Sequence, residues 1–156
     1  MFFQSKLRKE NEILKQDNLK LLDIGTGSGC IAIALKKNRP TWNVLAMDIS
    51  EDALEVANKN ATQNNVEINF IKQDILISHI PSLLPTFDII VSNPPYFTEL
   101  TLSPDAARSQ SRSVGALPFE ALLGGVGRLL AQNGRFCVVL PEKEGNTVLL
   151  PENYEY

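Results

Sequence analysis

The sequence is poor in the residues that build metal centres, disulfide frameworks and membrane spans. Its 156 residues include two cysteines and one histidine. Cys30 and Cys137 each stand inside an apolar segment, so we expect two reduced thiols in the core rather than a disulfide. A single histidine, His79, cannot hold a metal ion by itself, and we expect no metal site. No apolar run approaches the roughly 20 residues of a membrane span and no secretion signal opens the chain, so a cytoplasmic protein is expected.

An excess of one charge sign is also lacking. Fifteen basic and 18 acidic residues give a net charge of -3 at pH 7, which argues against a broad basic surface for nucleic acid but not against a small local one. The length and the 44% hydrophobic content fit one domain with its own core. Residues 1–18 are polar and carry both charge signs, so we expect a polar leader followed by a single domain over residues 19–156.

From Leu19 onward, apolar runs that fit strands alternate with helical patterns. This alternation predicts an α/β fold with a mainly parallel sheet and helices on both faces. Ser50 is the expected N-cap of the second helix. Gly124, Gly125 and Gly127 disfavour the last helix, which must therefore depend on packing. The expected elements are strands at 20–24, 44–47, 66–71, 87–91 and 135–140, and helices from 30 to the Arg39-Pro40 stop, from 51 to 63 and from 118 to 132.

The most informative segment is Asn93-Pro94-Pro95-Tyr96, which follows the apolar run 87–91. Two prolines end strand pairing and stiffen a turn at the carboxyl end of a strand, where open α/β sheets bind their ligands. Such a turn resembles the catalytic loop of S-adenosylmethionine-dependent N-methyltransferases, which methylate a nitrogen conjugated to a planar group. Taken alone, the segment also fits a plain turn after a strand.

The residue types suit the chemistry that this resemblance implies. The target nitrogen is a weak nucleophile because its lone pair is delocalised, and no ordinary side chain can deprotonate it first. The Asn93 side-chain oxygen and the Pro94 carbonyl can hold the NH2 group so that its lone pair faces the methyl carbon. The ring of Tyr96 would stack on the flat target. The expected catalytic residues are Asn93, Pro94, Pro95 and Tyr96.

A glycine-rich turn, Asp23-Ile24-Gly25-Thr26-Gly27-Ser28-Gly29, joins the first strand to the first helix and is typical of nucleotide sites. Asp48, after the second strand, is expected to accept from both ribose hydroxyls, and Asp74, after the third strand, from an adenine amino group. The charge of Asp23 suits the positively charged methionyl end of S-adenosylmethionine and favours this cofactor over a dinucleotide. Structural roles stay open for Asp48 and Asp74, such as an Asx turn. The expected cofactor-binding residues are Asp23, Gly25, Thr26, Gly27, Gly29, Asp48, Ile49, Asp74, Ile75 and Asn93.

Together these segments resemble the class I S-adenosylmethionine-dependent methyltransferases over residues 20–140, which implies a Rossmann-like fold. Residues 21–95 look like the enzymes that methylate the glutamine amide of peptide release factors. Residues 96–142 look like the tRNA adenine-N6 methyltransferases that modify an anticodon-loop adenosine of valine tRNA; the likeness lies in 103–108, 117–123 and 134–141. Because the later half builds much of the substrate side, adenine N6 in tRNA is the expected target. Release-factor glutamine is the alternative, and a cofactor-binding remnant without turnover is a third reading.

The same resemblance implies how tRNA would be held and what should follow the fifth strand. Arg108 and Arg112 are the best candidates for phosphate contacts, although a solvated loop face explains them equally well. The expected substrate-binding residues are Tyr96, Phe97, Arg108 and Arg112. Both families continue past the fifth strand with a helix and two strands, which residues 141–156 are too few to supply. We therefore expect a sheet truncated after its fifth strand, which would form an uncovered edge.

Overall fold

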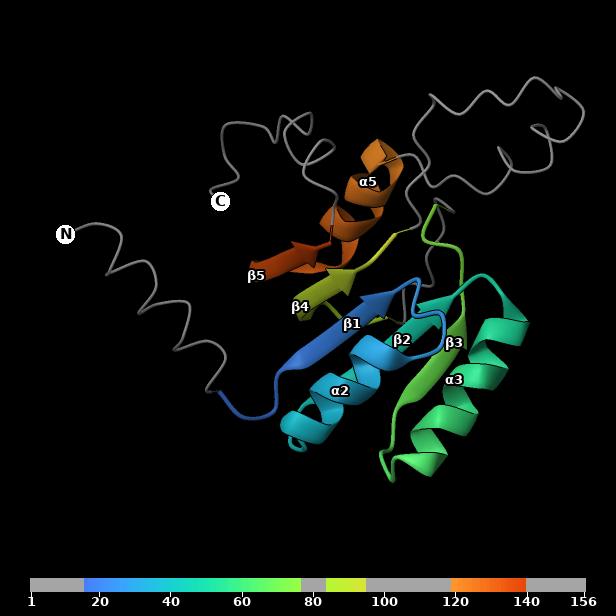
Figure 1. Cartoon of the computed structure of the whole chain (residues 1–156). Coiled ribbons are helices and arrows are strands. Elements are labelled where there is room, and N and C mark those ends of the chain that lie inside the picture. The colour runs from blue at the N-terminus through green and yellow to red at the C-terminus, as the bar shows by residue number, and fades with distance from the viewer. Residues whose placement is uncertain (1–15, 77–83, 95–118, 140–156) are drawn as a thin grey trace, which may run out of the picture.

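The computed structural model describes residues 16–76, 84–94 and 119–139, apart from the side chains of residues 119 and 120 (Figure 1). These residues form a five-stranded sheet in which every pairing is parallel and the order is β3-β2-β1-β4-β5. The expected α/β architecture is confirmed. The strands are β1 (Lys20–Ile24), β2 (Asn43–Asp48), β3 (Asn69–Lys72), β4 (Phe87–Ser92) and β5 (Leu130–Val138), and the helices are α2 (Cys30–Asn38), α3 (Glu51–Gln63) and α5 (Phe119–Leu129).

The central strand β1 supplies core to both faces of the sheet. Leu21 and Leu22 are both fully buried, and successive side chains of a strand point to opposite faces. Leu21 packs in a cluster with Ala32 of α2, whereas Leu22 packs in a second cluster with Leu122 and Val126 of α5. Helices α2 and α5 therefore cover opposite faces, as the alternation of elements predicted.

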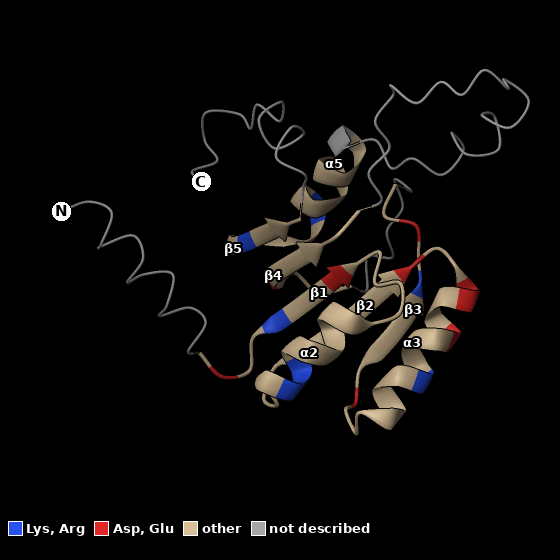
Figure 2. Cartoon of the chain, in the orientation of Figure 1, with Lys and Arg blue, Asp and Glu red and all other residues tan. Residues whose placement is uncertain are grey.

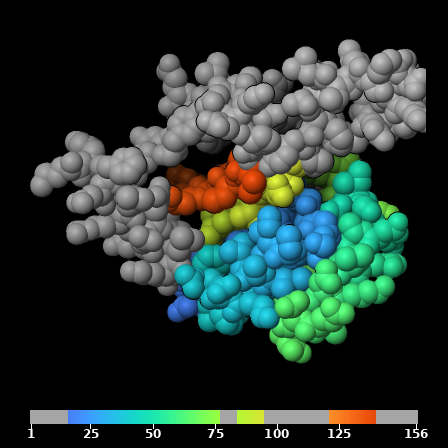
Figure 3. Space-filling model, in the orientation of Figure 1, coloured from blue at the N-terminus to red at the C-terminus, as the bar shows by residue number. Residues whose placement is uncertain are grey.

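Helix α3 lies beside α2 on the same face. In the space-filling view of Figure 3, the residues of α2 and α3, coloured blue through green, form one continuous surface in front of the sheet. A Cβ on Gly29 would stand 3.1 Å from the Cβ of Ala57, so the start of α2 approaches α3 too closely for a larger residue. The expected N-cap of α3 is confirmed, since the Ser50 hydroxyl accepts a hydrogen bond from the Ala53 N–H.

Three predicted elements have clearly different bounds in the structure. The third strand was expected at 66–71, but β3 spans Asn69–Lys72. The last helix was expected to reach residue 132 and the fifth strand to span 135–140, but α5 ends at Leu129 and β5 begins at once, spanning Leu130–Val138. The reason is a long-range pairing: Leu130 pairs with Phe87, and β5 then bulges before Arg135 pairs with Ile89.

The two cysteines are not core residues, contrary to expectation. Cys30 and Cys137 are free and exposed. Cys30 is the first residue of α2 and Cys137 lies on β5, the outer strand of the described sheet, so neither is enclosed by neighbouring elements. Both line one groove of about 480 Å³ between α2 and the ends of β4 and β5. Among the described residues, no helix is long and apolar enough to cross a membrane.

Candidate functional site

The predicted site residues of four strands come together at one edge of the sheet. Ile24, near the end of β1, pairs with Met47 of β2 and with Ser92 of β4, so these strands end at the same level. Figure 2 shows acidic residues at this end of β1 and β2 and at the start of α3, whereas the basic residues of α2 lie at its opposite end. Among the described residues, the carboxyl edge of the sheet therefore carries a group of carboxylates, which suits a ligand that carries positive charge.

The glycine turn after β1 is held open by backbone conformation. Gly25, Gly27 and Gly29 have φ angles of 68°, 56° and 80°, a region that other residues rarely adopt. The N–H groups of Gly25 and Thr26 both donate to the Met47 carbonyl, at 2.9 and 3.0 Å, which fixes the turn to β2. A Cβ added at Gly25 or Gly27 would meet nothing within 4 Å. Open space therefore lies over these two glycines, where a ligand can approach the backbone.

Asp23 carries a buried acceptor that the described residues leave unused. Only 1% of its surface is exposed. Its Oδ2 accepts from the Thr26 hydroxyl at 2.7 Å and from the Ala32 N–H at 3.3 Å, but no described group donates to Oδ1. Burial raises the pKa of the Asp23 carboxyl above its usual value, against the opposing effect of these two hydrogen bonds. A buried carboxylate oxygen without a donor is costly, so this atom indicates a ligand that brings a cationic N–H.

Asp48 and Asp74 each form an Asx turn, the structural role that the sequence allowed beside cofactor binding. The Asp48 Oδ1 accepts from the Ser50 N–H at 2.9 Å, and its Oδ2 accepts from the Gly27 N–H at 2.8 Å. The Asp74 Oδ1 accepts from the Leu76 N–H at 2.8 Å. A carboxylate has about four lone-pair positions, so each acid retains acceptor capacity for a ligand. Asp48 also ties the glycine turn to the end of β2.

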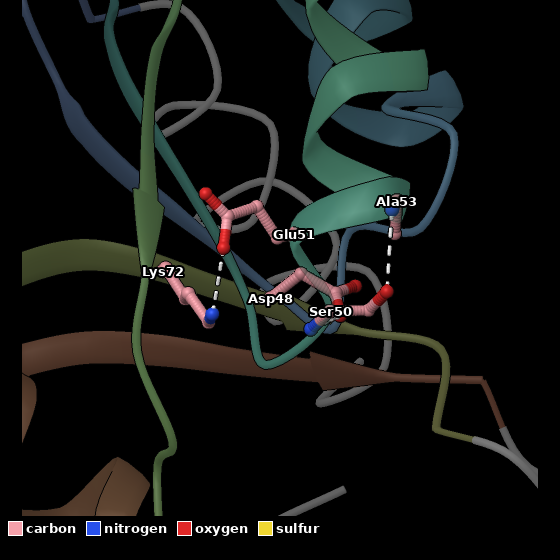
Figure 4. A network of polar contacts seen from close by, with 5 residues as sticks. All are labelled: Asp48, Ser50, Glu51, Ala53 and Lys72. Atoms are coloured by element: carbon pink, nitrogen blue, oxygen red, sulfur yellow. Dashed lines mark hydrogen bonds and ion pairs between the residues drawn. The ribbon is translucent and has the colours of Figure 1, made fainter.

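The first turn of α3 is fixed beside Asp48 by further polar contacts (Figure 4). Lys72, at the end of β3, forms an ion pair with Glu51 at 2.8 Å, and this lysine holds the pKa of Glu51 below its usual value. Both side chains are largely exposed, so the pair adds little stability. Its role is to join the end of β3 to the start of α3, on either side of the Asp48 turn.

Ser92 connects the predicted catalytic turn to the cofactor side. Ser92 is 2% exposed. Its hydroxyl donates to the carbonyl of Ile24, the last residue of β1, at 2.9 Å. Its own carbonyl accepts from the Val139 N–H at 3.0 Å. Ser92 was not among the predicted site residues, although a hydroxyl at the end of the apolar run 87–91 was a usable signal. Asn93, the next residue, is exposed, and Pro94 is buried.

Five of the predicted site residues fall outside the described residues: Pro95, Tyr96, Phe97, Arg108 and Arg112.

The apolar residues beside the two acids differ in exposure. Ile49 is 67% exposed, whereas Ile75 is buried in the core at 4%, so a ligand could reach only the backbone of Ile75. Leu76, which was not among the predicted site residues, is 38% exposed and stands two positions after Asp74. Each of the two acids therefore has an exposed apolar residue close to it in the sequence. Among the described residues, no group of three or more histidine, cysteine or acidic side chains could hold a metal ion.

Known proteins match this chain along most of its length. The family described as "Methyltransferase small domain" matches residues 5–155. The release factor glutamine methyltransferase of Flavobacterium psychrophilum is 56% identical over 93 residues, which cover 59% of this chain and 32% of that protein. The tRNA1(Val) (adenine(37)-N6)-methyltransferase of Bacteroides thetaiotaomicron is 40% identical over 125 residues, which cover 78% of this chain and 52% of that protein.

A solved structure confirms the fold. TrmN from Thermus thermophilus superposes with a TM-score of 0.63 at 26% identity, over 96% of this chain and 40% of that chain. The chain thus spans about half or less of the length of these relatives. The resemblance inferred from the glycine turn and the Asn93-Pro94 turn is confirmed at the level of the family. The chain belongs to the methyltransferase small domain family, whose enzymes depend on S-adenosylmethionine.

Proposed function

We propose that this chain is an S-adenosylmethionine-dependent N-methyltransferase that acts on a planar amino group, adenine N6 in tRNA. The observation that carries the proposal is the position of Asn93 and Pro94 directly after β4. Ser92, the last residue of β4, is hydrogen-bonded to Ile24, after which the glycine turn begins. This hydrogen bond fixes the Asn93-Pro94 turn, which can hold an amino group, to the glycine turn, which can hold a nucleoside.

The cofactor fits the described residues at several points. The unused Asp23 Oδ1 suits the ammonium group of the methionyl part, and the space over Gly25 and Gly27 admits the molecule. Asp48 would accept from the ribose hydroxyls, and Asp74 from the adenine amino group. The exposed side chains of Ile49 and Leu76 would flank the adenine ring. When bound, S-adenosylmethionine supplies an electrophilic methyl group.

The chain's own contribution to the reaction is orientation of the target. The Asn93 side-chain oxygen and the Pro94 carbonyl would accept hydrogen bonds from the two N–H groups of the target. These bonds turn the nitrogen lone pair towards the methyl carbon and stabilise the positive charge that develops on the nitrogen. Tyr96 would stack on the planar group, and the surplus proton would pass to water. An adenine in tRNA must leave its base stack to reach this turn.

Two observations support tRNA as the substrate. The tRNA-modifying relative from Bacteroides thetaiotaomicron aligns over 78% of this chain at 40% identity, although a release factor glutamine methyltransferase of Lactococcus lactis aligns over 89% at 38% identity. Residues after the catalytic turn, such as 103–108 and 117–123, resemble that family in the sequence. Arg108 and Arg112 would then contact phosphates.

A second candidate is methylation of a release-factor glutamine. It is favoured by the 56% identity to the Flavobacterium enzyme, and by a Lactococcus lactis release factor glutamine methyltransferase that is 38% identical over 149 residues. A glutamine amide offers the same planar NH2 group to Asn93 and Pro94, so the described geometry serves either target. The difference must come from the surface that holds the rest of the substrate.

Transfer of a labelled methyl group tests the proposal and separates the two candidates. The protein is incubated with methyl-labelled S-adenosylmethionine and either unmodified valine tRNA or a purified release factor. We expect label in the tRNA and none in the release factor. Label in the release factor alone would replace the first candidate with the second. Calorimetric binding of the cofactor without transfer to either substrate would contradict the proposed activity.

Asp48→Ala is expected to weaken cofactor binding before it affects turnover. The substitution removes the acceptor for the ribose hydroxyls and the bond that holds the Gly27 N–H. Hydrogen bonds to a charged group contribute about 1.5–3 kcal/mol, so the dissociation constant should rise about tenfold to a hundredfold. Calorimetry measures this constant, and kcat at saturating cofactor should change little. An unchanged dissociation constant with a reduced kcat would show that Asp48 acts elsewhere.

A further inference from the structure

Helix α5 contains three glycines whose surroundings differ. A Cβ added at Gly127 would meet nothing within 4 Å, and one at Gly124 would meet only the Arg128 guanidinium at 3.9 Å. At Gly125 the added atom would collide with Ile75, standing 2.8 Å from its Cδ1 and 2.9 Å from its carbonyl oxygen. Glycine disfavours a helix at all three positions, but only at Gly125 does a neighbouring backbone leave no room for a larger residue.

A second residue of the same helix contacts the same point. The Arg128 Nη2 donates a hydrogen bond to the Ile75 carbonyl at 3.1 Å. The Ile75 side chain is 4% exposed and packs in the cluster that contains Leu122 and Val126 of α5. Helix α5 therefore holds Ile75 by its side chain, by close backbone approach and by a hydrogen bond, across 53 positions of sequence.

Ile75 is the middle residue of the turn that presents Asp74. The Leu76 N–H donates to the Asp74 Oδ1 at 2.8 Å, and the Gln73 side chain donates to the Asp74 carbonyl at 3.1 Å. These bonds shape the turn internally, and the Gln73 N–H, which donates to the Asp48 carbonyl at 3.0 Å, ties the residue before Asp74 to β2. On the other side of Asp74, the attachment that the described residues show comes from Ile75, so a displacement of Ile75 would move the Asp74 carboxylate.

We propose that Gly125 and Arg128 are positioning residues for the adenine end of the cofactor. By clamping Ile75, α5 sets where the Asp74 carboxylate stands when it accepts from the adenine amino group. This inference rests on the proposed function, in which Asp74 makes that contact. Gly125 then has a role in nucleobase recognition, although α5 lies on the opposite face of the sheet from α2 and α3.

The test compares two cofactor products that differ at one position of the base. S-adenosylhomocysteine carries the amino group, whereas S-inosylhomocysteine carries an acceptor oxygen at that position, which cannot donate to Asp74. A site built to bond an N–H rejects the analogue that lacks it, so we expect the unmodified protein to prefer the adenine compound by more than about tenfold. Calorimetric dissociation constants for both compounds give this preference directly.

Gly125→Ala is expected to weaken binding of the adenine compound about tenfold and to reduce the preference to within about twofold. The matched control is Gly127→Ala, in the same helix but facing open space, which should leave both values unchanged. Arg128→Met should reduce the preference about threefold, and Arg128→Lys should restore part of it, because a donor returns to the Ile75 carbonyl. The arginine variants keep the test decisive if Gly125→Ala does not fold.

The outcomes distinguish this inference from the proposed function. If Gly125→Ala and Arg128→Met weaken both compounds by the same factor, the preference survives and α5 has only a structural role, which overturns the inference. Asp74→Asn provides the reference. If the unmodified protein shows no preference, or Asp74→Asn does not change it, the proposed adenine contact itself is wrong. If Asp74→Asn abolishes the preference and the α5 variants retain it, the contact stands and only the positioning role fails.

Discussion

Asn93→Ala is expected to lower kcat by about 100- to 1,000-fold while largely keeping the affinity for S-adenosylmethionine, to which Asn93 is also a predicted contact. Asn93 is exposed at the carboxyl end of β4, where its side-chain oxygen would accept from the target amino group. Removing one preorganised group that stabilises developing charge typically costs a factor of that size. The loss should fall on kcat, because the bond becomes stronger as the nitrogen acquires positive charge. Steady-state kinetics with calorimetric cofactor binding separates the two quantities.

The control for this substitution is Asn43→Ala, at the opposite end of the sheet. Asn43 is the exposed first residue of β2, and its replacement should change neither kcat nor cofactor affinity. If Asn93→Ala bound the cofactor about ten times more weakly at an unchanged kcat, Asn93 would be a cofactor ligand and not the group that orients the target.

The affinity for S-adenosylmethionine is expected to rise with pH through the native pKa of Asp23. Burial raises this pKa above the model-peptide value of 3.8, so at low pH the carboxyl is protonated and cannot pair with the ammonium group. Asp23→Asn should remove this dependence and weaken binding about a hundredfold near neutral pH, since the variant loses a charged partner in a buried position. Calorimetry from just above pH 3.8 to about pH 7 suits the test, because the cofactor's own amino group stays protonated over that range.

Asp23 should also affect the stability of the cofactor-free protein, with the opposite pH trend. Its folded pKa is raised, so between 3.8 and that higher pKa the folded chain holds more protons than the unfolded chain. The free energy of unfolding therefore falls as pH rises through this window, and the cost of the buried charge is fully present above it. The difference between the wild type and Asp23→Asn isolates this contribution, and Asp52→Asn on the exposed first turn of α3 is the control. Cofactor binding independent of pH, with normal affinity in Asp23→Asn, would contradict the role assigned to the unused Oδ1.

The predictable parts of this fold depend on local sequence. β1 was predicted at its observed bounds because a short apolar run leads straight into a glycine turn. Helix α3 was predicted because Ser50 caps it and an apolar stripe follows. Parallel strands end at one edge of the sheet, so the acids and the asparagine that follow strands could be placed together without coordinates. This topological rule is why Asp23, Asp48 and Asn93 were predicted from the sequence to lie in one site.

The parts that the sequence did not predict depend on contacts between distant residues. Helix α5 ends early because Leu130 pairs with Phe87, a contact invisible to helical spacing. Cys137 is exposed because β5 is the outer described strand, whereas its neighbours in sequence are apolar like those of a core strand. The clash that requires glycine at position 125 arises from Ile75, and the hydroxyl of Ser92 finds its partner in β1.

The central claim is that the turn after β4 orients a planar amino group for methyl transfer, and identification of the methylated atom tests it most directly. The protein is allowed one turnover with methyl-labelled S-adenosylmethionine and unmodified valine tRNA, and the digested nucleosides are identified by mass spectrometry. We predict label on the exocyclic N6 of adenosine, at a rate that Asn93→Ala reduces by about 100-fold or more. Label on a ring nitrogen, a carbon or a ribose oxygen, or transfer that Asn93→Ala leaves unchanged, would contradict the account.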